Sequence, residues 1–168
     1  KEQVVNQALA AATIEEHRCD TNSDEDLCPA LKVAAALGDP MQPAVALMAL
    51  EASLTTPVVL GGGTQMAAVA ALIQRLYQQG YAGDLSNIGL ATTAWVAEDP
   101  SADLAGILAQ LPYPMAAFYA DLSFTDSKIS NLRRYQEGLV KEGVGAGAAA
   151  FAAFVAGDIS HDQLVSEI

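Results

Sequence analysis

The stretch Pro57-Val58-Val59-Leu60-Gly61-Gly62-Gly63-Thr64-Gln65 passes from an apolar run through three glycines into a helical pattern. Residues 57–60 have the apolar composition of a short strand, and residues 64–79 continue as a helix that ends at Gly80. A strand followed at once by a helix is the repeating unit of an α/β protein. This stretch therefore decides the fold class that we expect.

The same unit recurs toward the C-terminus. We expect strands at 87–93 and 115–120, and helices at 101–111, 129–140 and 147–156. Ser101 is the expected cap of the helix at 101–111, with Asp103 in its first turn. Short apolar strands that alternate with helices predict a parallel sheet covered on both faces.

Three helices are expected before the first strand. They cover residues 4–18, 29–37 and 43–54, and the last of them is apolar on nearly all sides, which is typical of a buried helix. The chain begins with Lys1 rather than an initiator Met, and a helical pattern is already in progress there. We therefore expect residues 1–168 to be a single α/β domain that is a fragment of a longer chain.

The composition indicates one globular domain with a sizeable core. Of the 168 residues, 52% are hydrophobic and 17% charged, with a mean hydropathy of +0.25. The formal net charge of −12 argues against a nucleic-acid or anionic-membrane surface, because both need clustered Lys and Arg. No uninterrupted apolar stretch approaches the roughly 18 residues of a membrane span, so we expect a soluble, cytoplasmic protein.

Two cysteines, Cys19 and Cys28, flank an acidic loop at residues 20–26. Their spacing fits no common zinc site, the histidines at 17 and 161 lie far from each other, and no metal or cofactor is expected. A disulfide across the loop is geometrically feasible. Two free thiols are favoured, because no secretory signal is recognised.

Three loops have the best position for binding a ligand, since ligands of parallel α/β sheets sit beyond the carboxyl ends of the strands. They are residues 61–65, the turn after Thr93, and residues 121–125. The glycine turn at 61–65 could present N–H groups to an anion or to the edge of a planar ring, or could merely allow close packing of strand and helix. Trp95 is expected to be a partly buried anchor rather than a stacking platform.

A second glycine-rich segment, Lys141-Glu142-Gly143-Val144-Gly145-Ala146-Gly147, places one carboxylate immediately before an alanine-rich helical run. Glycines let a backbone approach a ligand closely, and an acid held among them can act as a general base. An acid near a helix N-terminus is also favourable when it is simply solvated. The spacing alone leaves both interpretations of Glu142 open.

Four segments in this order resemble a known enzyme family. They are Gly38-Asp39-Pro40-Met41-Gln42-Pro43, the glycine turn with its flanks at 57–66, Ala91-Thr92-Thr93-Ala94-Trp95-Val96, and the segment 141–147. Together they resemble the C-terminal half of the nicotinate-nucleotide:dimethylbenzimidazole phosphoribosyltransferase family, in its divergent and less characterised branch. The resemblance covers residues 33–154.

This resemblance implies a reaction of cobalamin lower-ligand synthesis. The family transfers the phosphoribosyl group of nicotinate mononucleotide to 5,6-dimethylbenzimidazole and releases nicotinate and α-ribazole 5′-phosphate. It also implies a three-layer α/β/α, Rossmann-like fold, in which the terminal helices belong to a smaller helical part. A homodimer is the usual state of the family.

The resemblance also implies roles for individual residues. The glutamate of the family's Glu-Gly-x-Gly-Ala motif is its catalytic base, and it falls on Glu142. A positioned carboxylate that frees the attacking nitrogen of its proton typically contributes about 10²–10⁴ in rate. The other residues implied to contact substrate are Asp39, Gln42, Gly61, Gly62, Gly63, Thr64, Gln65, Ser123, Gly143, Gly145 and Ala146.

One feature of the family has no match in this sequence. A glycine-threonine phosphate loop belongs to the family's N-terminal half, so we expect the missing half of the same protein to complete the nucleotide site. The acceptor could be a base related to dimethylbenzimidazole. The alternative function is that of a non-catalytic relative, which binds a nucleotide or base in a regulatory or structural role.

Overall fold

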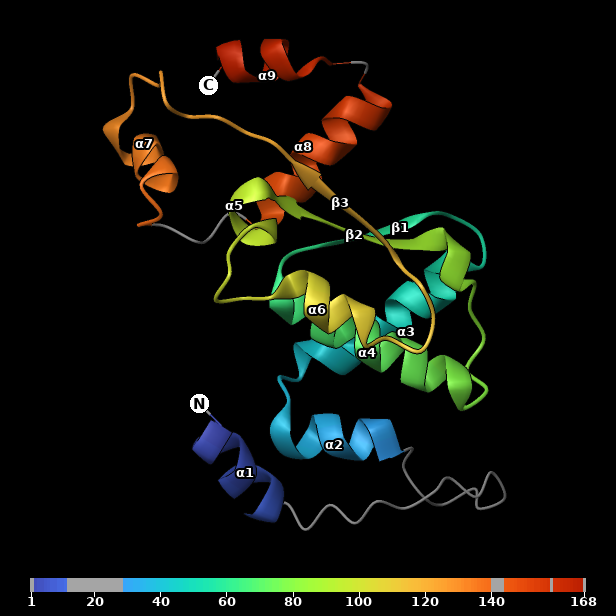
Figure 1. Cartoon of the computed structure of the whole chain (residues 1–168). Helices are drawn as coiled ribbons and strands as arrows, with labels where there is room; N and C mark the ends of the chain where they lie inside the picture. Colours follow the sequence, from blue (N-terminus) through green and yellow to red (C-terminus); the bar gives the residue numbers. More distant parts are fainter. Residues whose placement is uncertain (1, 12–28, 140–143, 158, 168) are drawn as a thin grey trace.

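The computed structural model describes residues 2–11, 29–139, 144–157 and 159–167 (Figure 1). Along them the helices and strands are, in chain order, α1 (Glu2–Ala11), α2 (Pro29–Leu37), α3 (Met41–Ser53), β1 (Val58–Gly61), α4 (Thr64–Gln78), the 3₁₀-helix η1 (Leu85–Asn87), β2 (Ile88–Thr93), α5 (Ala94–Ala97), α6 (Leu104–Ala109), β3 (Ala116–Ala120), α7 (Ser130–Gln136), α8 (Val144–Ala156) and α9 (His161–Glu167).

The strands form a parallel sheet in the order β1-β2-β3. The central strand β2 pairs with β1 up to Gly61↔Ala91 and with β3 up to Thr93↔Ala120. Every residue of β2 is buried, as expected for a strand that is covered on both faces. The predicted α/β fold with a parallel sheet is confirmed.

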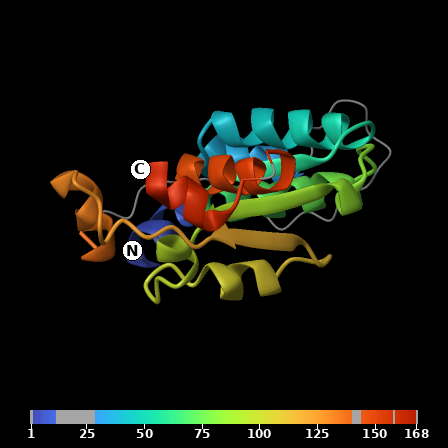
Figure 2. The same cartoon turned by 90° about the horizontal axis from the view of Figure 1, so that it is seen from above.

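Helices cover both faces of this sheet. On one side α4 packs against α3 and α6, and α3 also contacts β1 (Figure 1). On the other side α8 contacts all three strands, and the view from above shows it lying lengthwise over the sheet (Figure 2). The predicted three-layer α/β/α arrangement is therefore confirmed.

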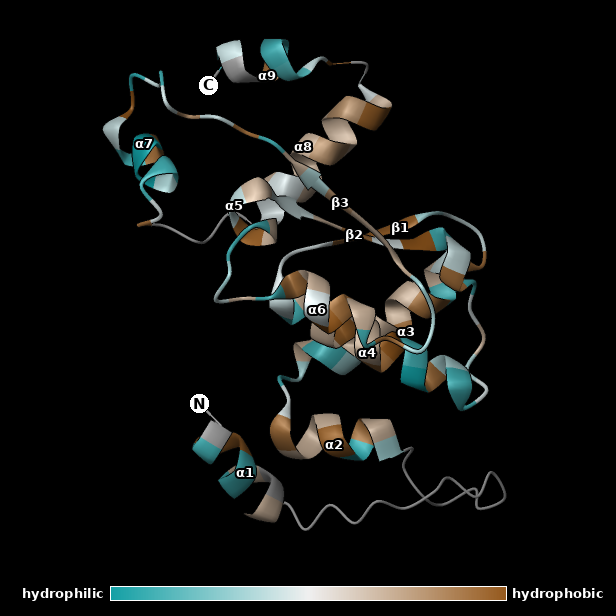
Figure 3. Cartoon of the chain, in the orientation of Figure 1, coloured by the Kyte–Doolittle hydropathy of each residue, from teal (hydrophilic) through white to brown (hydrophobic). Residues whose placement is uncertain are grey.

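The main hydrophobic core lies between the sheet and the α3–α4 layer. Its buried residues come from α3, β1, α4 and β2: Ala46, Ala49, Leu50, Leu60, Val69, Ala70, Ile73, Leu76 and Ile88. A second cluster, Ala67, Leu90, Val96 and Leu104, joins α4 to β2 and α6. Both clusters use one apolar face of α4, and the exposed residues of this helix include Thr64, Gln65, Arg75 and Gln78. Figure 3 shows the resulting mixture of hydrophobic and hydrophilic residues along α4.

Two buried polar side chains tie the loops to this core. Gln74 of α4 donates from Nε2 to the Tyr113 carbonyl at 2.9 Å and accepts from the Tyr113 N–H at 2.8 Å, so it fixes the approach to β3. Ser53 at the end of α3 accepts from the Asp84 N–H at 2.8 Å, and its carbonyl accepts from Asn87 Nδ2 at 2.8 Å. These bonds hold the segment that leads into β2.

The prediction of a buried helix at 43–54 is wrong in two respects. The helix α3 starts two residues earlier, at Met41, whose N–H donates to Asp39 Oδ1 at 2.9 Å, although the cap residue Pro40 makes no side-chain bond. Only one face of α3 is buried, while Met48 is 70% exposed. An apolar side chain on a surface helix is common, so apolarity alone did not predict burial.

The helix predicted at 101–111 is shorter, and its cap is a different residue. Asp103, not Ser101, caps α6, with Oδ1 accepting from the Gly106 N–H at 3.1 Å. Asp103 is in the left-handed region, with φ 44° and ψ 48°, which Asp tolerates better than most residues. Ser101 instead bonds to the side chain of Asp99, at 2.9 Å from its N–H and at 2.7 Å from its hydroxyl.

The remaining helix boundaries differ by a few residues. The helix predicted at 129–140 is α7, which ends at Gln136, and Gly138 follows with a φ of 68°. The short helices α5 and α9 were not predicted. The predicted extension of the first helix from 12 to 18 lies outside the described residues, as do Cys19 and Cys28. None of the described helices has the length and apolar character that crossing a membrane requires.

Candidate functional site at the carboxyl edge of the sheet

The glycine turn at 61–65 lies where β1 ends. The Gly62 N–H donates to the Ala91 carbonyl at 3.0 Å, which extends the pairing of β1 and β2 one residue past the strand. A Cβ on Gly62 would lie 2.3 Å from Met66 Cγ, so this glycine is needed for the close packing of the turn against α4. Of the two interpretations of the turn, close packing accounts for Gly62.

The N-terminus of α4 directly follows the glycines of the turn. Its cap residue, Gly63, makes no side-chain cap bond, and Thr64 and Gln65 are exposed. The first N–H groups of a helix have no partner within the helix, and the helix dipole adds partial positive charge there. The second interpretation of the glycine turn, a set of N–H groups that can hold an anion, therefore fits Thr64 and Gln65.

Two threonines that were not among the predicted site residues end the central strand. Thr92 is 1% exposed and Thr93 is 0% exposed, and neither Oγ1 has a hydrogen-bond partner among the described residues. A buried hydroxyl without a partner costs free energy, and such groups are rare in folded proteins. Two adjacent hydroxyls at the end of an otherwise apolar strand were the available sequence signal.

The helix α8 begins at Val144, so Gly145 and Gly147 belong to its first two turns rather than to a preceding turn. Gly147 packs closely against the end of β2, because a Cβ on this residue would lie 2.1 Å from the Thr92 carbonyl carbon and 2.5 Å from the Thr93 nitrogen. Among the described residues, no heavy atom lies within 4 Å of the position that a Cβ on Gly145 would take, and Ala146 is exposed. The two glycines of one motif therefore have different surroundings.

The predicted base, Glu142, and its neighbour Gly143 lie outside the described residues. In sequence Glu142 stands two residues before α8, and α8 starts at the edge where β2 ends. The helices α4 and α8 cover opposite faces of the sheet, but the beginnings of both helices lie at its carboxyl edge (Figure 1). The role of Glu142 as a base remains a prediction.

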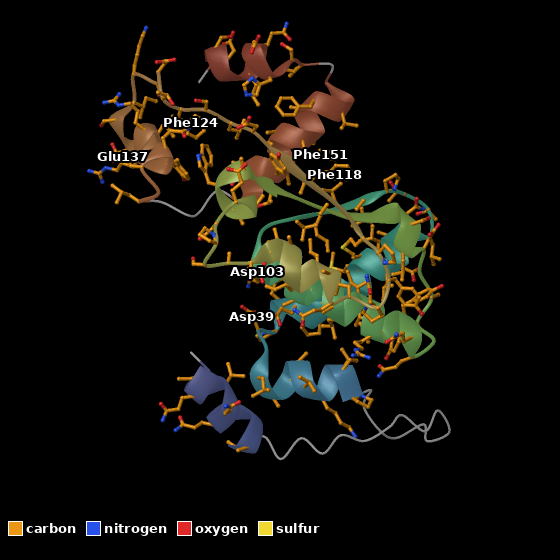
Figure 4. All side chains as sticks on the ribbon, viewed as in Figure 1. Asp39, Asp103, Phe118, Phe124, Glu137 and Phe151 are labelled. Atoms are coloured by element: carbon orange, nitrogen blue, oxygen red, sulfur yellow. The ribbon has the colours of Figure 1, made fainter. Side chains whose placement is uncertain are left out.

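Asp39 lies two residues before α3, and Gln42 is the second residue of this helix. The Gln42 N–H donates to the Asp39 carbonyl at 2.9 Å, and Asp39 is exposed. Because α3 leads into the first residue of β1, its N-terminus lies toward the edge where the strands end, and Asp39 appears on that side together with Asp103 (Figure 4). Ser123 is exposed on the segment after β3, where its hydroxyl lies 3.2 Å from that of Thr125. In the sheet, β2 lies between β3, which precedes Ser123, and β1, which precedes the glycine turn.

An aromatic cluster fixes α7 beside this edge. The Trp95 ring lies 5.0 Å from the Phe124 ring and 5.2 Å from the Tyr135 ring, and its Nε1 donates to Gln136 Oε1 at 3.4 Å. Trp95 is partly buried, as predicted for an anchor. The cluster joins α5, the segment after β3 and α7, and the chain runs from α7 into residues 140–143.

His161 joins α9 to the segment after β3. Its Nε2 lies 2.5 Å from the Asp121 carbonyl, and its Nδ1 lies 3.3 Å from Asp162 Oδ1. The Asp162 side chain and then the Asp121 carbonyl raise the pKa of His161 above its usual value. Among the described residues, no three His, Cys, Asp or Glu side chains are grouped closely enough to hold a metal ion.

No family model matches the sequence. The chain is 46% identical over 162 residues to the UPF0284 protein of Synechocystis sp., 48% over 141 residues to that of Gloeobacter violaceus and 45% over 138 residues to that of Crocosphaera subtropica. These matches cover 96%, 83% and 82% of this chain but only 42%, 37% and 37% of the relatives. The homologues are thus UPF0284 proteins, a name that states no reaction, and the chain spans about two fifths of their length.

Proposed function

We propose that the full-length protein, whose homologues are UPF0284 proteins, transfers phosphoribosyl from nicotinate mononucleotide to 5,6-dimethylbenzimidazole or a related base. The products are nicotinate and α-ribazole 5′-phosphate. The proposal rests on the family resemblance of four ordered segments. Its main support in the structure is that the glycine turn, the Thr92-Thr93 end of β2 and the start of α8 share one edge of the sheet, although up to 86 residues separate them.

The proposed chemistry needs one base and an anion site. The free base nitrogen of the benzimidazole attacks C1′ of the nucleotide, a new N–C1′ bond forms, and the bond from C1′ to the pyridine nitrogen breaks. The bonding electron pair goes to that nitrogen, so the pyridinium leaves as neutral pyridine. Glu142 accepts the N–H proton of the benzimidazole, which prevents charge from building up on the attacking ring.

The start of α4 is suited to the phosphate of the nucleotide. Thr64 and Gln65 are exposed residues that begin a 15-residue helix, where the N–H groups have no partner within the helix and negative charge is stabilised. The part of the full-length protein outside this chain supplies the rest of the nucleotide site in this proposal. A homodimer is proposed on the same family resemblance.

The test is turnover by the full-length protein with Glu142→Gln. We expect nicotinate release in the presence of dimethylbenzimidazole to fall by about 10²–10⁴-fold, since the amide cannot accept the proton. Glu137→Gln is the matched control, because Glu137 is an exposed acid at the end of α7, five positions earlier (Figure 4). Equal turnover by the parent and Glu142→Gln would contradict the assignment of the base.

A separate measurement distinguishes the enzyme from the non-catalytic alternative. A ligand that binds only the folded state raises the unfolding temperature whether or not it reacts. Stabilisation by nicotinate mononucleotide without any nicotinate release, at high protein concentration and with several benzimidazoles, would favour the binding protein over the transferase.

A further inference from the structure

The hydroxyls of Thr92 and Thr93 point to opposite faces of the sheet. Successive side chains of a strand alternate, and Leu90 packs in the cluster formed with α4 and α6. Thr92, two residues later, therefore faces the same layer, where α4 begins. Thr93 shares the face of Gly89 and Ala91, which is the face covered by α8.

Thr92 and the start of α4 both have hydrogen-bond donors that lack a partner among the described residues. Thr92 Oγ1 is a buried donor without a partner among the described residues, and α4 begins at a glycine that supplies no capping side chain. All of these groups can donate a hydrogen bond and carry no negative charge. An oxyanion is the ligand that accepts from a hydroxyl and from helix N–H groups at once.

We propose that Thr92 Oγ1 and the first N–H groups of α4 form one subsite for the phosphate monoester of a sugar phosphate. The inference takes the identity of the ligand, a phosphoribosyl group, from the proposed function, whereas the oxyanion site stands on the geometry. The hydroxyl is covered in this chain, so binding includes a local movement of the glycine turn at 61–63. Turns and helix starts are the parts of a fold that open at the lowest cost.

A role in binding also explains why residue 92 is a threonine. An unpaired buried hydroxyl weakens the folded chain, whereas a valine of the same shape would not. A cost to stability that is offset when ligand binds is the pattern expected of a binding residue rather than of a core residue. A threonine with a structural role would show the reverse, because valine would then remove a hydrogen bond.

The experiment compares Thr92→Val with Thr93→Val in the full-length protein. Both hydroxyls are buried and lack a partner among the described residues, so both variants should unfold about 2–4 °C higher than the parent without ligand. Only Thr92→Val should bind ribose 5-phosphate more weakly in calorimetry, by roughly 10- to 100-fold, because it loses a hydrogen bond to a charged acceptor. Thr92→Ser should retain most of the affinity.

The ligands separate the possible results. Thr92→Val should bind inorganic phosphate, ribose 5-phosphate and nicotinate mononucleotide more weakly than the parent does. Nicotinate riboside, which has no phosphate, should bind the parent and Thr92→Val with equal affinity. A lower unfolding temperature for Thr92→Val, or a loss of affinity confined to Thr93→Val, overturns the inference. Phosphate binding that depends on Thr92 without transfer to any benzimidazole would leave the subsite standing and refute the proposed function instead.

Discussion

Gly147→Ala tests how closely α8 packs on the sheet. The added Cβ would lie 2.1 Å from the Thr92 carbonyl carbon and 2.2 Å from its oxygen, about 1.3 Å short of the 3.4 Å at which ordinary contact begins. The obstacle is backbone in the central strand, which cannot rotate away as a side chain can. The helix must therefore move off the sheet as a unit.

The cost of this movement follows from what α8 contacts. Its Ala150 is buried in a cluster with Ala120, and its Phe151 stacks on Phe118 of β3 with ring centroids 4.6 Å apart (Figure 4). Forcing extra volume into such a contact costs about 1–3 kcal/mol, and the upper end applies here because backbone is in the way. Alanine recovers at most about 1 kcal/mol from its helix propensity. We expect a net loss of about 2 kcal/mol.

The assay is urea unfolding of the full-length protein, with Gly145→Ala as the matched control. Gly145 lies two residues earlier in the same helix, and no heavy atom of the described residues lies within 4 Å of the position that its Cβ would take. Gly145→Ala should be neutral or more stable by up to about 1 kcal/mol, because alanine restricts the unfolded chain. Equal midpoints for Gly147→Ala and Gly145→Ala would refute the close contact between α8 and β2.

Two further predictions concern the loops that border the site. Gln74→Leu removes both hydrogen bonds to the Tyr113 backbone and should lower the free energy of unfolding in urea by about 2–4 kcal/mol. The control Gln78→Leu, on the exposed face of α4, should change this free energy by less than about 0.5 kcal/mol, and equal effects of the two variants would contradict the role of Gln74. The doubly protonated His161 ring can donate to the Asp121 carbonyl and to the Asp162 carboxylate together, and its pKa is raised in the folded state. The stabilisation that His161 gives to the packing of α9 is therefore greatest below about pH 6.5 and is lost as the pH rises through the folded-state pKa. Hydrogen-exchange protection of α9 should therefore fall with rising pH relative to α4, and His161→Gln should abolish this dependence; protection that is independent of pH in the parent would contradict it.

The strands could be predicted almost to the residue. Apolar runs at 57–60, 87–93 and 115–120 became β1, β2 and β3, each displaced or shortened by one residue. The buried central strand β2 is apolar up to its two final threonines, and the glycines and polar residues that end the strands are adjacent in sequence. Four of the five residues of β3 are exposed, so its apolar run predicted the strand but not its burial. The α2 helix was predicted at its observed bounds for the same local reason, because Gly38 directly follows it.

Helix starts and burial could not be predicted as well. Asp103 caps α6 through a left-handed backbone that no pattern of polar residues reveals, and Met48 is exposed because nothing in the described chain packs on its face of α3. Each depends on contacts with another element. Apolar composition states what a helix can bury, and only its neighbours determine what it does bury.

The residue types of the candidate site and their order can be read directly from the sequence. They are a glycine turn after a strand, two threonines at the end of the next strand, and a glutamate among glycines before a helix. The sequence also predicted that the glycine turn and the turn after Thr93 lie at the carboxyl ends of parallel strands. The three-dimensional fold was needed to show that Gly147 packs against the Thr92 backbone and that the two threonine hydroxyls lack a partner among the described residues. Both a hydroxyl's hydrogen bond and a backbone contact depend on how close two segments lie in space, and these segments are far apart in the chain. A lone hydroxyl looks the same in sequence whether it has a partner or lacks one.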